Sequence, residues 1–144
     1  MHITQHLSPI SIFTYGSLMF APVWQRIVSG HYVSCPAILT NYQRLAVKNE
    51  EYPVAIPTTG HHIQGVLYHA VHAQDVLHLD EFEGEYYERT PVTVCTDSNT
   101  IVAAYVYVLR PAFHHIAAEQ AWDVDKFARG GGLESFMERY QGFH

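Results

Sequence analysis

The sequence predicts an α+β fold in which short β-strands form a curled sheet or barrel accompanied by helices. Between His31 and Tyr68, β-prone segments alternate with turn-rich breaks, and two further β runs follow before residue 110. Apolar residues at helical spacing occur before, between and after these strands. A chain of 144 residues can bury one hydrophobic core, and this one shows no internal repeat or linker, so we expect a single domain over residues 1–144.

The first strand and the first helix lie on either side of a glycine turn. Residues 10–15 form an apolar, β-branched run after Pro9, which is typical of a strand. The apolar residues that follow the turn recur every three or four positions: Phe20, Val23, Trp24, Ile27 and Val28. Pro22 stands near the start of this segment and Gly30 beyond its end, so it is predicted to be an amphipathic helix that packs in the core.

The middle of the chain is rich in β-branched and aromatic residues. Four short strands are predicted there, at residues 32–35, 44–47, 52–56 and 63–68. Thr58-Thr59-Gly60 is interpreted as a break between the last two. Gly65 interrupts the final strand, which indicates a bulge or a tight bend that allows a sheet to curl.

A hairpin and further helices complete the expected fold. The β runs at residues 90–94 and 101–109 are separated by Asp97-Ser98-Asn99, which predicts a hairpin. Residues 73–82, which precede it, have helical spacing. Residues 117–140 are predicted to form one or two more helices, broken by Gly130-Gly131-Gly132.

Composition and charge argue against several classes of protein. The formal net charge is −6, and the 8 Lys and Arg residues are spread singly, which argues against nucleic-acid binding. Cys35 and Cys95 lie far apart without metal-ligand spacing, so we expect neither a zinc site nor a disulfide framework. No apolar run approaches the ~18 residues that cross a membrane, and residues 1–9 do not resemble a secretory signal. We therefore expect a cytoplasmic protein that binds no membrane; no oligomeric state is predicted.

Two features indicate a small active site. The turn Tyr15-Gly16-Ser17-Leu18 follows a strand, and such a glycine turn exposes backbone N–H groups that can hold a carboxylate or a carbonyl oxygen. On a helical wheel, Glu83 lies roughly 20° from Val76 and roughly 40° from Leu79. A carboxylate on this apolar arc loses hydration, which raises its pKa toward the range of acid–base catalysis, and the charge of Asp80 acts in the same direction.

Each candidate also has a purely structural interpretation. Glu83 can be a solvated residue at a frayed helix end, or a partner of Arg89. Ser17 follows a strand and precedes a helix, as some nucleophiles do, but the Gly-x-Ser-x-Gly pattern is missing. The histidine pairs at 61–62 and 114–115 suggest a metal, yet neighbouring strand residues point to opposite faces and no Cys or carboxylate stands at ligand spacing. Exposed loop histidines are the better interpretation.

Six short segments occur in a set order over residues 12–109. They are Phe13-Thr14-Tyr15-Gly16-Ser17-Leu18, Tyr52-Pro53, Gly65-Val66-Leu67-Tyr68, Leu79-Asp80-Glu81-Phe82-Glu83-Gly84, Tyr86-Tyr87-Glu88-Arg89 and Ala104-Tyr105-Val106-Tyr107. In this combination the chain resembles the γ-glutamylcyclotransferase-like superfamily, most closely the branch that contains γ-glutamylamine cyclotransferases and plant avirulence-induced proteins. The resemblance implies a small curled mixed β-barrel flanked by helices, with the loop and the glutamate facing one cavity.

The resemblance also implies a reaction and the residues that carry it out. In such a family, the glutamate matching Glu83 is the acid and base that cyclises a small γ-glutamyl amine or peptide to 5-oxoproline and releases the amine. No metal or organic cofactor is needed. The matching substrate-binding residues are Tyr15, Gly16, Ser17, Leu18, Tyr87 and Tyr107.

Several points stay open on the sequence alone. Met19-Phe20 replaces basic residues that some branches carry after the loop, so the substrate is not predicted. The alternatives to an enzyme are a non-catalytic small-ligand-binding module of the same fold and a stress-response interaction protein with an acidic, aromatic-rich partner surface. A cavity shared by Glu83, Gly16 and Ser17 would favour ligand chemistry. The helices beyond Arg110 are expected to cap that cavity.

Overall fold

The computed structural model describes residues 8–139. Its strands are β1 (Ile10–Thr14), β2 (Ser34–Val47), β3 (Pro53–Val71), β4 (Tyr87–Thr96), β5 (Ile101–Leu109) and β6 (Ala117–Ala121). Its helices are α1 (Ala21–Ile27), α2 (Ala73–Glu83), α3 (Val124–Arg129) and α4 (Gly132–Arg139), and 3₁₀ turns span Ser17–Met19 and Pro111–Ile116.

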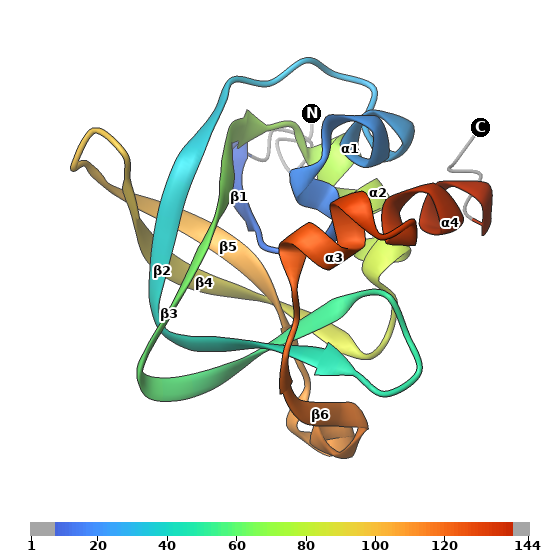
Figure 1. Ribbon diagram of the computed structural model, residues 1–144. Coiled ribbons are helices and arrows are strands. Elements are labelled where there is room, and N and C mark those ends of the chain that lie inside the picture. The colour runs from blue at the N-terminus through green and yellow to red at the C-terminus, as the bar shows by residue number, and fades with distance from the viewer. Residues whose placement is uncertain (1–7, 140–144) are drawn as a thin grey trace.

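Five of the strands form a closed mixed β-barrel (Figure 1). The strand order is β3–β1–β5–β4–β2, and the pairing of β2 with β3 closes the ring. β1 and β5 are parallel, whereas the other pairs in the ring are antiparallel. The barrel expected from the sequence is confirmed, as is the hairpin of β4 and β5, in which Cys95 pairs with Ile101 next to the turn.

The middle of the chain forms two long strands, so the prediction of four short ones is wrong. β2 and β3 pair from Ser34 and Tyr68 to Ala46 and Pro53, and residues 58–60 lie inside β3. Polar residues that suggested breaks occupy exposed positions of these strands. One register shift interrupts the pair, at Asn41.

Gly65 does not form a bulge between β2 and β3. The register of β2 and β3 continues without a shift from Ala37–Gly65 to Ile38–Gln64. A Cβ at position 65 would collide with the carbonyl oxygen of Thr14 and come within 2.6 Å of the Phe13 ring. Glycine therefore allows β1 to lie against β3, which closes the barrel.

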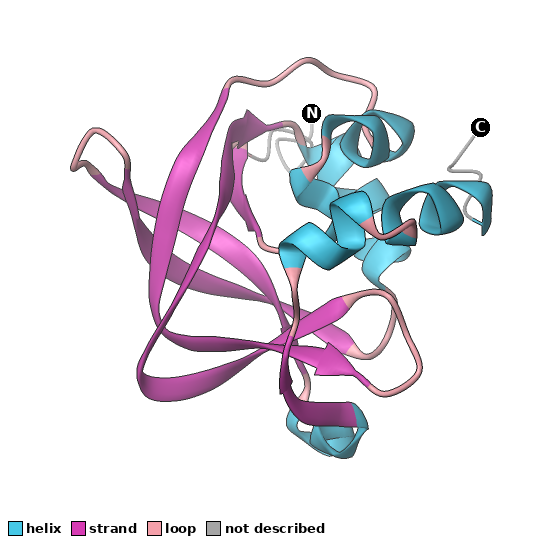
Figure 2. Ribbon diagram, in the orientation of Figure 1, coloured by secondary structure: helices cyan, strands magenta, loops and turns pink. Residues whose placement is uncertain are grey.

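The helices α1 to α4 gather at one side of the barrel, whereas the 3₁₀ turn Pro111–Ile116 lies apart from them (Figure 2). The predictions of α1 and α2 are confirmed, and α2 ends at Glu83 because the chain turns at Gly84 with φ 80°. Residues 117–121 were expected to be helical but form β6, since they pair with the free edge of β2 at Leu45 and Val47. The predicted helices that follow are α3 and α4, whereas Tyr140 lies outside the described residues. No described helix is long and apolar enough to cross a membrane.

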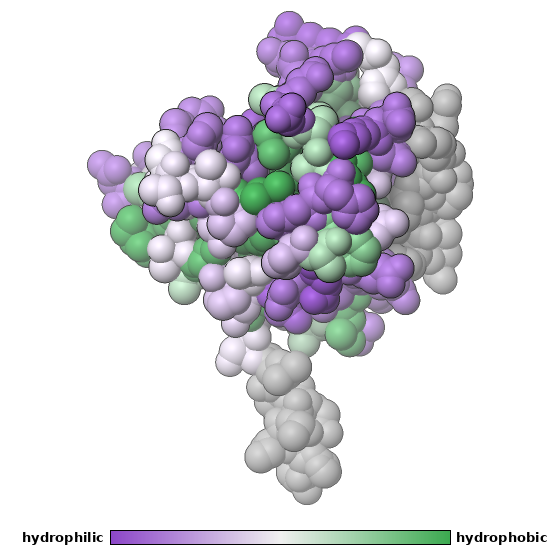
Figure 3. Space-filling model, turned by 90° about the horizontal axis from the view of Figure 1, so that it is seen from below, coloured by the Kyte–Doolittle hydropathy of each residue, from purple (hydrophilic) through white to green (hydrophobic). Residues whose placement is uncertain are grey.

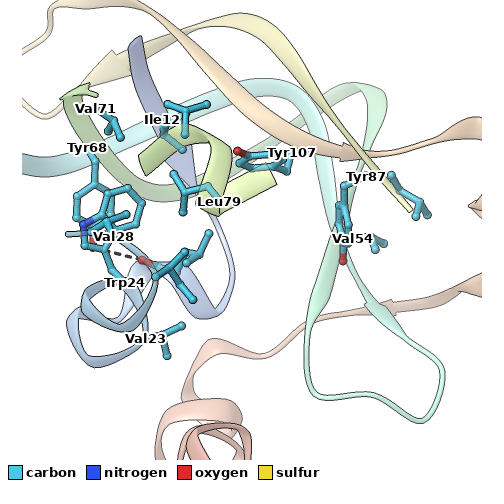
Figure 4. Packing of buried hydrophobic residues seen from close by; sticks show 14 of the residues in the cluster. Ile12, Val23, Trp24, Val28, Val54, Tyr68, Val71, Leu79, Tyr87 and Tyr107 are labelled. Carbon is cyan, nitrogen blue, oxygen red and sulfur yellow. Dashed lines mark hydrogen bonds between the residues drawn. The ribbon is translucent and has the colours of Figure 1, made fainter. Parts of the chain in front are cut away.

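Apolar residues form two clusters because strand side chains alternate between the faces of the barrel wall. Phe13 and Val106 belong to one cluster, whereas Ile12 and Tyr107 belong to the other, which the helices complete. In the second cluster the rings of Trp24 and Tyr68 stack at 3.6 Å (Figure 4). On the face shown in Figure 3, hydrophilic residues surround smaller apolar groups.

Candidate active site

One pocket of about 450 Å³ brings together residues from distant parts of the chain. Its wall consists of the end of β1 and the following loop, the start of β3, the end of α2, the start of β4 and a residue of β5. Every predicted site residue lines it: Tyr15, Gly16, Ser17, Leu18, Glu83, Tyr87 and Tyr107. The structure therefore brings the loop and the carboxylate to one cavity, an arrangement that favours ligand chemistry.

The loop after β1 has backbone donors that the protein does not use. The carbonyl oxygens of Gly16 and Ser17 accept hydrogen bonds from the backbone N–H groups of Met19 (3.0 Å) and Phe20 (3.1 Å), which forms the 3₁₀ turn. Over residues 8–139, no hydrogen bond occupies the N–H groups of Gly16, Ser17 or Leu18. Adjacent unbonded N–H groups in a pocket wall favour an anion or a carbonyl oxygen as the ligand.

Packing holds this loop in place. The Tyr15 ring is buried, and its hydroxyl donates a 2.6 Å hydrogen bond to the carbonyl oxygen of Tyr107. The Tyr68 hydroxyl donates to the carbonyl oxygen of Leu18 at 3.3 Å. A Cβ at Gly16 would lie 2.8 Å from two ring carbons of Pro53, so the glycine also allows the start of β3 to close on the loop.

Glu83 is the pocket residue best suited to move a proton. It lies on the last turn of α2, and Val76 and Leu79 on the same arc are buried as predicted. Desolvation, together with the smaller effect of the nearby Asp80 carboxylate, raises the pKa of Glu83 to about 8. Solvent reaches part of Glu83, although no described residue hydrogen-bonds its carboxyl group. Near neutral pH this group can therefore both accept and donate a proton.

Asp80, one turn earlier on α2, differs from Glu83 because its carboxylate accepts hydrogen bonds from neighbouring side chains. The Arg89 guanidinium donates two hydrogen bonds to its carboxylate, at 2.9 and 3.3 Å, and the Tyr107 hydroxyl donates a third at 2.7 Å. Arg89 therefore pairs with Asp80, so the alternative in which Arg89 is the partner of Glu83 is wrong. Asp80 is therefore held in place beside Glu83 by these hydrogen bonds.

The two predicted pocket tyrosines are anchored by their hydroxyl groups. The Tyr87 hydroxyl donates to the carbonyl oxygen of Pro53 at 3.0 Å, and the Tyr107 hydroxyl donates to Asp80. Burial raises the pKa of both phenols far above the usual range, so they remain neutral. Because their hydroxyl protons are used within the protein, these tyrosines can offer a ligand only oxygen lone pairs and ring surface.

The other sequence candidates find less support in the structure. Ser17 is buried in the pocket wall, but no histidine lines the pocket within the described residues to activate it. In the same part of the chain, no group of three His, Cys, Asp or Glu side chains is placed to hold a metal ion.

Several residues of the pocket wall were not predicted to be site residues from the sequence. Phe82, Glu85 and Tyr86 complete the end of α2 and the loop to β4, and Tyr52 and Pro53 complete the start of β3. The signal for most of them was available, because they lie in the segments that carry the family resemblance. Their meeting at one pocket depends on the barrel, however, and the pattern of apolar residues does not reveal it.

The expectation that the C-terminal helices cap the pocket finds no support among the described residues. Among the described residues, none after Tyr107 lines it. Instead, Phe127 of α3 packs against Phe20 at 5.4 Å and against Trp122 at 5.3 Å. The α3 helix thus packs against the start of α1.

Comparisons with known proteins agree with this fold. A family model described as "Gamma-glutamyl cyclotransferase, AIG2-like" matches residues 12–124. AIG2-like protein D of Arabidopsis thaliana is 33% identical over 98 residues, which are 67% of this chain and 62% of that protein. The chain thus spans about three-fifths of the length of this relative.

Solved structures share the fold. The solution structure of an Arabidopsis thaliana protein has a TM-score of 0.69 and 24% identity, and the match covers 96% of this chain and 92% of that one. A structure described as a gamma-glutamyl cyclotransferase has a TM-score of 0.60 and 18% identity, over 70% and 66% of the two chains. With the family match over most of its length, this chain belongs to the AIG2-like gamma-glutamyl cyclotransferase family.

Proposed function

We propose that this protein is a γ-glutamylcyclotransferase that converts a small γ-glutamyl amine to 5-oxoproline and releases the amine. The observation that supports this most is the position of Glu83, a carboxyl group with a pKa of about 8 in a pocket that it shares with the Gly16–Leu18 backbone. The pocket volume of about 450 Å³ suits a ligand of this size.

The proposed reaction needs one group that first takes and then returns a proton. Ionised Glu83 accepts a proton from the substrate α-ammonium, and the free amine attacks the γ-carbonyl carbon of the same molecule. The five-membered ring closes as the C–N bond forms. Protonated Glu83 then donates this proton to the departing nitrogen, and the old amide bond breaks. The carboxylate, ionised again, accepts the second proton of the ring nitrogen and passes it to the released amine, which leaves as an ammonium ion. A pKa of about 8 is close to that of an amine, so these transfers have a small free-energy cost.

The loop and the tyrosines position the substrate in this proposal. The N–H groups of Gly16, Ser17 and Leu18 bind the γ-glutamyl portion through its oxygen atoms, and Tyr15 holds the shape of the loop. Tyr87 and Tyr107 provide apolar walls that bring the amine and the carbonyl together. An intramolecular reaction gains much of its rate from such restriction.

The charge of the pocket wall favours a leaving group without a carboxylate. Glu83 and Glu85 line the pocket, and none of the described Lys or Arg side chains does so. The terminal carboxylate of a γ-glutamyl peptide would meet repulsion there without a cation to offset it. We therefore expect neutral or cationic leaving amines to be preferred over peptides.

Release of 5-oxoproline from a panel of γ-glutamyl amines, γ-glutamyl dipeptides and glutathione tests the proposal. Wild type is compared with Glu83→Gln, and Glu81→Gln is the matched control because Glu81 is exposed on the same helix. We expect turnover of the amines, a loss of at least about 10³-fold in Glu83→Gln and little change in Glu81→Gln. Ligand binding without turnover would instead support the non-catalytic binding module.

A further inference from the structure

Arg44 is a partly buried cation with no acidic partner in the described part of the chain. Its Nη1 donates hydrogen bonds to the carbonyl oxygens of Tyr15, at 3.0 Å, and Gln64, at 3.2 Å. Burial lowers its pKa, but a guanidinium keeps its charge in proteins. Removing a charge from water costs folding free energy. An arginine that is partly buried beside the loop is therefore expected to have a function there.

The surroundings of Arg44 keep its guanidinium in one place. The Trp122 ring lies over the guanidinium, 5.5 Å from its central carbon to the ring centroid. The indole N–H of Trp122 donates to the carbonyl oxygen of Glu51 at 2.8 Å, and its ring packs against Phe127. The C-terminal segment thus contacts Arg44 through Trp122, while the loop after β1 and strand β3 provide the carbonyl groups that its guanidinium binds.

The peptide unit between Tyr15 and Gly16 joins Arg44 to the pocket. In a trans peptide the C=O and N–H groups point in opposite directions, and no described peptide bond is cis. The C=O receives the Arg44 hydrogen bond, whereas the N–H of Gly16 is unbonded. Gly16 lines the pocket and Arg44 does not. A cation on the carbonyl oxygen holds this peptide in orientation and makes its N–H a stronger donor.

We propose that Arg44 is a positioning residue that orients the Tyr15–Gly16 peptide and lends positive charge to recognition of the substrate α-carboxylate. This inference rests on the proposed function, in which the loop binds the γ-glutamyl portion. It also accounts for how a pocket without a Lys or Arg in its described lining can attract an anionic group. Because the α-carboxylate is bound before and during ring closure, Arg44 acts on substrate affinity more than on the chemical step.

Two measurements on one set of variants test this role. Steady-state kinetics with a γ-glutamyl amine separates KM from kcat, and calorimetry gives the Kd of 5-oxo-L-proline, which carries the same carboxylate. The variants are Arg44→Met, Arg44→Gln and Arg44→Lys. The control is Arg26→Met, because Arg26 also donates to a carbonyl oxygen, that of Met137, but from α1.

We expect Arg44→Met to raise KM and Kd about tenfold or more, with kcat changed less than about threefold. Arg44→Lys should recover part of the affinity, and Arg26→Met should match wild type. If Arg44→Met does not fold, Arg44→Gln takes its place, and the same changes in KM, Kd and kcat are expected. A lower melting temperature with unchanged KM and Kd would overturn the inference, as would wild type that does not bind 5-oxo-L-proline. Binding that depends on Arg44 without any turnover would uphold the inference and reject the proposed function.

Discussion

Two carboxylates on one turn of α2 differ in their surroundings. Asp80 accepts hydrogen bonds from Arg89 and Tyr107, whereas no described residue donates a hydrogen bond to the Glu83 carboxyl group in the pocket. The helical wheel predicted the side on which Glu83 lies and the direction of its pKa. It could not predict that Arg89 contacts Asp80, because that pair depends on how β4 lies beside α2.

Asp80→Asn should lower the pKa of Glu83. The change removes the like charge that, after desolvation, keeps this pKa high. We expect the pH dependence of kcat/KM to move to lower pH by about half a unit to one unit. Asp125→Asn removes the same charge from an exposed position on α3 and serves as control. An unchanged profile in Asp80→Asn would show that Asp80 does not act on Glu83.

Glu83→Gln should stabilise the protein at high pH. The pKa of Glu83 is about 8 in the folded protein and near 4.5 when unfolded, so the folded state holds the proton more tightly and stability falls as pH rises between these values. Above pH 8 we expect the glutamine variant to gain roughly 1–3 kcal/mol over wild type in urea unfolding, and to gain little at pH 4. A variant less stable than wild type at pH 9 would contradict the predicted desolvation of Glu83.

At the scale of elements, one buried carboxylate joins α1 to α2. Asp75, on the first turn of α2, accepts hydrogen bonds from the backbone N–H groups of Ser29 and Gly30, each at 2.9 Å, and from the Tyr32 hydroxyl at 2.6 Å. The sequence predicted both helices from the spacing of their apolar residues. This connection could not be predicted, because it links residues more than forty positions apart.

Asp75→Ala should destabilise the protein by about 2–4 kcal/mol, because it removes the three hydrogen bonds that this buried carboxylate accepts. The hydrogen bonds from Tyr32, Ser29 and Gly30 lower the pKa of Asp75 against the opposing effect of burial. Its contribution is therefore present at neutral pH and is lost as pH falls below its unfolded value of about 3.8 toward its folded value. Urea unfolding at pH 7 and pH 2.5 measures both effects. If Asp75→Ala lost the same unfolding free energy at both pH values, the stabilising effect would not depend on the charge of Asp75.

At the scale of the whole molecule, the pocket exists because the barrel closes. Local patterns identified most strands and α1 and α2, but the length of β2 and β3 follows from their pairing, which allows polar residues at exposed positions. For the same reason residues 117–121 joined the edge of β2 although their composition favours a helix. The site residues were identified through a family resemblance, since no local pattern predicts which loops meet at one end of a barrel.

Gly65→Ala tests the closure of the barrel. The new Cβ would meet the Thr14 carbonyl oxygen and the Phe13 ring, so β1 must move away from β3. We expect a loss of about 3 kcal/mol or more in unfolding free energy, together with weaker ligand binding because β1 leads into the loop. Gln64→Ala, at an exposed neighbouring position, should have little effect on either quantity. Equal stability of Gly65→Ala and wild type would show that the two strands do not approach this closely.

The central claim is that Glu83 carries the proton during cyclisation, and the pH dependence of 5-oxoproline release tests it most directly. With one γ-glutamyl amine as substrate, kcat/KM of wild type should rise with an apparent pKa of about 8, the value for Glu83 in the free enzyme. Glu83→Gln should show no such rise and almost no activity. Full turnover by Glu83→Gln, or the same pH profile in both proteins, would contradict the account.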